Sequence, residues 1–64
     1  MTSKEMKKLR IKAEMRVIDL AKETGLSRSI IYYYEEGYRK ISPISAQKIR
    51  RVLNAKILEI NSLN

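Results

Sequence analysis

The chain of 64 residues contains no cysteine, no histidine, no tryptophan and no phenylalanine, and it has only one proline and two glycines. Without cysteine, neither a disulfide nor a redox centre can form, and the additional lack of histidine excludes a Cys/His zinc site. The length suits one small core built from aliphatic residues. We therefore expect residues 1–64 to form a single domain without metal or cofactor, in a reducing cytoplasm.

Acidic residues are scarce and unevenly distributed along the chain. Lys and Arg number 14 against 7 Asp and Glu, which gives a net charge of +7. Residues 1–16 carry a net +4 and residues 37–64 a net +5, whereas residues 17–36 carry a net −2. Such a basic excess favours a polyanionic partner. The basic residues on both sides of the central segment are placed to contact phosphates, while residues 17–36 between them can contact the bases.

Long apolar runs are also absent, so the sequence predicts neither a membrane span nor a signal peptide. A basic amphipathic N-terminal helix could lie on an anionic membrane, but its apolar stripe is narrow and lacks Trp and Phe. The carboxylates are scattered, and there is no Gly-rich phosphate-binding loop and no His or Cys for catalysis. We predict a protein that is not an enzyme and has no small-molecule ligand.

What remains is a pattern of short amphipathic helices. Ser3 is a candidate N-cap for a first helix from Lys4 to about Ala13, with Met6 and Leu9 on its apolar face. A second helix is predicted over Val17–Thr24, with Leu20, Ala21 and Val17 facing inward.

Two glycines mark the ends of the second and third helices. Gly25 lies where a C′ residue needs positive φ, and Ser27 can cap a third helix over Arg28–Glu36, which Gly37 ends. The order helix, short glycine-containing turn, helix is typical of a helix-turn-helix, here at residues 17–37. The prediction is an all-α, compact bundle of four to five helices.

The C-terminal third of the chain contains a further helical pattern. Ser42-Pro43 is a cap followed by proline at the first helical position. Residues 55–63 predict either a fifth helix or a continuation of the fourth past Asn54. Four apolar residues there exceed what a short tail helix needs, and we expect them to form a homodimer interface unless they pack on the first helix: Ile57, Leu58, Ile60 and Leu63.

Periodicity divides the third helix into two faces. The inward stripe is Leu26, Ile30, Ile31 and Tyr34, and the outward set is Arg28, Ser29, Tyr32, Tyr33 and Glu36. Because adjacent helical residues lie about 100° apart, Tyr32, Tyr33 and Tyr34 cannot all be buried. The second helix of a helix-turn-helix presents its outward face to the major groove of DNA.

Residue chemistry assigns the expected DNA contacts. Arg28 can bind guanine O6 and N7, Ser29 can donate or accept, and Tyr32 and Tyr33 can offer a hydroxyl or a ring face to a thymine methyl. Phosphate contacts are expected from Ser27 at a helix N-terminus and from a loop that carries Tyr38, Arg39 and Lys40. The alternative is a solvated loop, and exposed tyrosines also occur in protein interfaces.

The same residues resemble a known family, the lambda-repressor-like or Xre-type helix-turn-helix. The matching residues are Leu9-Arg10, Leu20-Ala21, Gly25 to Ser29, Ile31, Glu35, Gly37, Arg39-Lys40, Ser42-Pro43, Lys48-Ile49 and Val52-Leu53. The resemblance implies five helices, a cytoplasmic transcription regulator such as a Cro-like repressor, and a homodimer on a palindromic operator. It also implies a buried ion pair between Arg10 and Glu35.

The chain departs from the pattern of this family in three places. Arg16-Val17 stands where the family often has a capping Ser or Thr followed by Gln, so we expect Arg16 to take over a phosphate contact. Glu36 stands where Asn is usual. Residues 55–64 lack the sequence pattern that is usual for the fifth helix of this family.

A second family, the MerR-type winged helix, is similar over Val17–Ala21, Thr24-Gly25, Tyr33–Glu35 and Gly37–Arg39. Its wing would have to lie between the tyrosines and Gly37, and no residues remain there. A different class of function also stays open, because a helix-turn-helix can serve protein–protein interaction, as in an antitoxin or anti-repressor.

Overall fold

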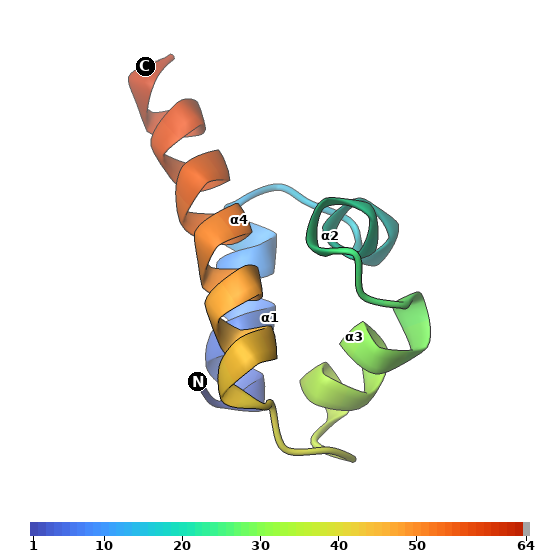
Figure 1. Cartoon of the computed structure of the whole chain (residues 1–64). Coiled ribbons are helices and arrows are strands. Elements are labelled where there is room, and N and C mark those ends of the chain that lie inside the picture. Colours follow the sequence, from blue (N-terminus) through green and yellow to red (C-terminus); the bar gives the residue numbers. More distant parts are fainter. Residues whose placement is uncertain (64) are drawn as a thin grey trace.

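The computed structural model describes residues 1–63. Asn64, the last residue of the C-terminal segment 55–64 in which we expect the dimer interface, lies outside the described residues. The described chain consists of α1 (Ser3–Lys12), α2 (Val17–Thr24), α3 (Arg28–Glu36) and α4 (Pro43–Ser62), without a strand in residues 1–63. Figure 1 shows α1 and α4 side by side, with α2 and α3 on the other side of the bundle. The predicted all-α fold class is confirmed.

The first helix begins one residue earlier than the sequence pattern suggested. Thr2, and not Ser3, is the N-cap: its hydroxyl accepts from the Glu5 amide at 3.1 Å. The Glu5 carboxylate in turn accepts from the Thr2 amide at 3.0 Å, which completes a capping box. The prediction of Ser3 as N-cap was wrong because it did not take into account that Glu5, three residues after Thr2, can return a hydrogen bond to Thr2.

The bounds predicted for the second and third helices are confirmed. Each ends at a glycine in the left-handed region, Gly25 at φ 76° and Gly37 at φ 78°. Ser27 caps α3 by accepting from the Ile30 amide at 3.1 Å. The turn between the two helices is therefore set by local residues and gives α3 a defined starting direction.

The C-terminal third forms one helix of 20 residues, α4. The five helices implied by the family resemblance are thus four in residues 1–63, and the alternative of a continuation past Asn54 is correct. Residues 53–57 contain no glycine or proline, so nothing interrupts the hydrogen bonding of the helix there. At its start Ser42 accepts from the Ser45 amide at 3.1 Å, with Pro43 in the first turn.

All four helices contribute to one core. Its fully buried large side chains are Met6 of α1, Leu20 of α2, Ile31 of α3, and Ile49 and Leu53 of α4. Both α1 and α2 pack against α3 and against α4. The core therefore holds α3 by its inner face only, and its outer face remains free for a partner.

Candidate nucleic-acid interface

The outward face of α3 carries the four residues that we expected to read DNA. Arg28 and Ser29 are exposed in its first turn, and Tyr32 and Tyr33 are 50% and 40% exposed. Tyr34, in contrast, is buried and its hydroxyl donates to Ser45 Oγ at 3.0 Å. The structure thus divides the three tyrosines as the helical period predicts, and brings the four expected readers onto one surface.

An aromatic cluster that sequence reasoning missed extends this surface. The rings of Tyr32, Tyr33 and Tyr38 lie with their centroids 6.1–6.2 Å apart in tilted or edge-on arrangements. The Tyr38 amide also donates to the Tyr33 carbonyl at 2.9 Å. Coulombic interactions, first with Tyr38 and then with Glu36, raise the pKa of Tyr32 above its ordinary value.

A largely buried ion pair ties the C-terminal end of α3 to α1. Arg10 Nε lies 2.6 Å from Glu35 Oε2 and Arg10 Nη2 lies 3.0 Å from Oε1, a two-point contact. The side chains are only 14% and 5% exposed, and Arg10 Nη1 also donates to the Met15 carbonyl at 2.9 Å. The hydrogen bond to Glu35 raises the pKa of Arg10. The structure thus joins the pair that the resemblance implies, and α1 thereby sets the orientation of α3.

Comparison with protein-family models gives a match over residues 6–60, to the family described as Helix-turn-helix. The match begins within α1 and ends within α4, so it includes α2 and α3 completely. The chain belongs to the lambda-repressor-like (Xre-type) helix-turn-helix family. Comparison with curated proteins and with solved structures gives no match.

Membership in the Xre-type family also decides between the two resemblances. A MerR-type domain has a wing after the recognition helix, whereas this Xre-type chain has a short loop and then α4.

In residues 1–63 no helix has both the length and the apolar character needed to cross a membrane.

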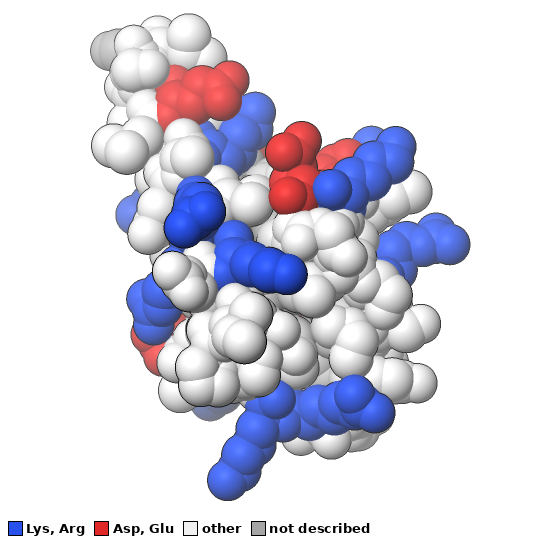
Figure 2. Space-filling view, viewed as in Figure 1, with Lys and Arg blue, Asp and Glu red and all other residues white. Residues whose placement is uncertain are grey.

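Basic side chains of this helix-turn-helix protein lie in the loop that follows α3. Arg39 and Lys40 are exposed in the loop between α3 and α4, next to a shallow hollow that they share with Met1, Thr2 and Ser3. Figure 2 shows long basic side chains at the lower edge, where Figure 1 places this loop. The closeness of the loop to the start of α1 was not foreseen, because it depends on how α1 packs on α3.

Arg16 differs in its surroundings from the other expected phosphate contacts. Its guanidinium donates to both carboxylate oxygens of Asp19 at 3.0 Å, and the Arg16 amide donates to the same carboxylate. These hydrogen bonds lower the pKa of Asp19 from the usual 3.8 to about 2. The Asp19 carboxylate thus satisfies the amide of the N-cap residue Arg16, whose own side chain makes no capping hydrogen bond to α2. Any phosphate at Arg16 has to compete with Asp19.

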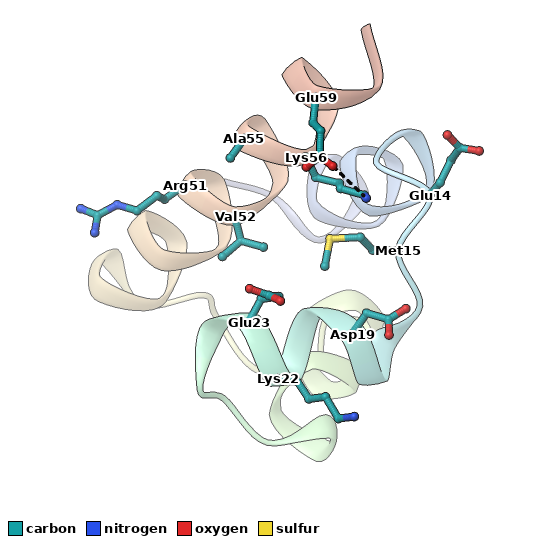
Figure 3. Close-up of a pocket in the computed structure, with 10 residues that line it drawn as sticks. All are labelled: Glu14, Met15, Asp19, Lys22, Glu23, Arg51, Val52, Ala55, Lys56 and Glu59. Atoms are coloured by element: carbon teal, nitrogen blue, oxygen red, sulfur yellow. Dashed lines mark ion pairs between the residues drawn. The ribbon is translucent and has the colours of Figure 1, made fainter. Parts of the chain in front are cut away.

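A groove, distinct from the hollow beside the α3–α4 loop, lies between α2 and the C-terminal half of α4 (Figure 3). Its volume is about 540 Å³, and Met15, Val52 and Ala55 supply its apolar part. Four of the seven acidic residues of the protein line it: Glu14, Asp19, Glu23 and Glu59. Lys22, Arg51 and Lys56 are also present, with Lys56 Nζ 3.9 Å from Glu59 Oε1. The excess of acidic over basic side chains in this groove disfavours a bound phosphate.

Of the four apolar residues expected at a dimer interface, three lie on the last turns of α4, which extend beyond the other helices (Figure 1), and Leu63 is the C-cap of this helix. Ile57 is partly buried against the core, and Ile60 is also partly buried. Leu58 and Leu63 are 70% and 81% exposed. The segment therefore only partly serves the core of its own chain.

Proposed function

We propose that this protein binds double-stranded DNA in a sequence-specific manner and regulates transcription, most simply as a repressor that occludes a promoter. The observation that carries the proposal is the outward face of α3, where Arg28, Ser29, Tyr32 and Tyr33 are exposed together. In the proposed complex, α3 enters the major groove and its N-terminal turn meets the base edges. Arg28 pairs with a guanine, and Ser29 and the tyrosines contact neighbouring bases.

Phosphate contacts are proposed on both sides of the reading face. Ser27 and the free amides at the start of α3 meet one phosphate, since a helix N-terminus favours an anion. Tyr38, Arg39 and Lys40 meet the backbone beside the other end of α3, and Arg16 contributes after exchange with Asp19. These contacts supply affinity and set register, whereas the bases supply specificity.

We further propose that two copies bind a palindromic operator through the last turns of α4. Leu58 and Leu63 would lose their exposure in such a dimer. Sedimentation with and without DNA tests this part: the expected result is a dimer at micromolar concentration. A monomer at high micromolar concentration, both with and without DNA, would contradict the proposed dimer.

A protein-interaction role is the second candidate, and the exposed tyrosine cluster with Glu36 beside it favours this reading. Salt dependence separates the two functions. Three cationic contacts per chain, Arg16, Arg39 and Lys40, amount to six in a dimer, so log Kd for duplex should change with log salt with a slope of about 5. Weak duplex binding that does not depend on sequence would instead support the interaction role.

A further inference from the structure

The reading face of α3 is hollowed where it meets the start of α2. This hollow, of about 460 Å³, is lined by Val17, Arg28, Ser29, Tyr32 and Tyr33. Four of these are the proposed base readers, whereas Val17 is the first residue of α2 and was expected only to face inward. Val17 is partly buried and packs against the core, so it forms an aliphatic wall beside the exposed side chains of α3.

The walls of the hollow differ in chemistry. Val17 and the two tyrosine rings are apolar, while the Arg28 guanidinium and the Ser29 hydroxyl are polar. In the major groove the apolar group that a base displays is the 5-methyl of thymine, beside hydrogen-bonding groups such as thymine O4 and guanine O6 and N7. An apolar hollow next to an arginine therefore matches a methylated pyrimidine next to a guanine.

We propose that this hollow binds the 5-methyl group of a pyrimidine adjacent to the guanine that Arg28 reads, and that Val17 determines this preference. The inference rests on the proposed function, because it requires α3 to lie in the major groove. The Ser29 hydroxyl can donate to thymine O4 or accept from the cytosine 4-amino group. Thymine and 5-methylcytosine therefore share the recognised chemistry, and the experiment separates them.

The test uses the full chain and the duplex that it selects from a random pool. Each thymine is replaced in turn by deoxyuridine, or its T·A pair is replaced by a C·G pair that carries cytosine or 5-methylcytosine, and Kd is measured by fluorescence anisotropy at fixed salt. One thymine per half-site, next to a guanine, should lose about fourfold in affinity as deoxyuridine, the ratio expected for one buried methyl group. If 5-methylcytosine restores the affinity that cytosine loses, both pyrimidines are ligands; if it does not, thymine alone is.

Variants assign the preference to Val17. Val17→Ala, and Val17→Thr as the substitution of nearly equal shape, should reduce the fourfold ratio between thymine and deoxyuridine toward one. Val52→Ala is the matched control, since Val52 is also partly buried but lines the groove between α2 and α4. It should keep the ratio, and urea unfolding reports whether each variant is folded.

The outcomes separate this inference from the proposed function. Sequence-specific binding in which no thymine methyl affects Kd overturns the inference and leaves the DNA-binding proposal standing. A thymine preference that survives in both folded Val17 variants overturns the role of Val17. Failure to select any duplex from the pool overturns the proposed function, and the inference with it.

Discussion

Removal of Arg10 should be among the most damaging single changes in this protein. In Arg10→Ala the Glu35 carboxylate, 5% exposed, loses both of the Arg10 donors, at 2.6 and 3.0 Å. An unpaired carboxylate in such a place is only partly hydrated, and breaking a largely buried pair in this way costs about 3 kcal/mol. Domains of this size have little stability to lose, so we expect a large part of the population to unfold at ambient temperature.

Two further variants make the prediction more specific. Glu35→Ala should destabilise less than Arg10→Ala, because Arg10 is 14% exposed and keeps the Met15 carbonyl at 2.9 Å. The double variant Arg10→Met with Glu35→Leu should regain most of the loss, since an apolar pair of similar volume avoids the cost of burying charge.

Urea unfolding followed by far-ultraviolet circular dichroism gives the free energies by linear extrapolation. Lys48→Ala is the control, because Lys48 is exposed on α4 and lies in no ion pair among the described residues. It should stay within about 0.5 kcal/mol of the wild type. If Arg10→Ala is no less stable than Lys48→Ala, the ion pair does not hold α1 to α3 and the reasoning fails.

Three smaller effects follow from other contacts. Tyr34→Phe removes the hydrogen bond to Ser45 Oγ at 3.0 Å and should cost about 1 kcal/mol in the same urea assay, and an unchanged midpoint would contradict it. Gly25→Ala should cost about 1 kcal/mol through its φ of 76° alone, because nothing lies within 4 Å of the added Cβ; a greater loss would indicate a clash. Asp19 has its pKa lowered to about 2, so its stabilising effect is complete above pH 3.8 and disappears as the pH falls from there to about 2. Thermal unfolding of Asp19→Asn should therefore depend less on pH across this window than the wild type, and parallel curves would refute the assignment.

Local residues account for how much of the fold could be predicted. Gly25 and Gly37 end helices because both adopt positive φ, and Ser27 begins α3 through its own hydroxyl, so sequence spacing alone located α2 and α3. The error at Ser3 was avoidable, since Thr2 and Glu5 have the spacing of a capping box. Exposure along α3 followed from helical period, which separated Tyr34 from its two neighbours.

Other features of the site depend on contacts between distant parts of the chain. The place of Val17 in the hollow depends on how α2 meets α3, and the place of Tyr38 on how its loop returns to Tyr33. The acidic groove likewise gathers residues from the α1–α2 turn, from α2 and from α4. No local pattern reports such distances, so only the packed structure could reveal these features. The Arg10–Glu35 pair came from family resemblance, since periodicity alone placed both charges on the surface.

Selection of duplexes from a random pool, carried out in parallel with the wild type, Arg28→Ala and Lys40→Ala, tests the central claim most directly. The account predicts one palindromic site for the wild type, with half-sites about 34 Å or a multiple of it apart. Arg28→Ala should lose the preference for a single guanine in each half-site, whereas Lys40→Ala should keep the sequence and bind more weakly. The absence of any enriched site, or an unchanged guanine preference in Arg28→Ala, would contradict the claim that α3 reads DNA through its outward face.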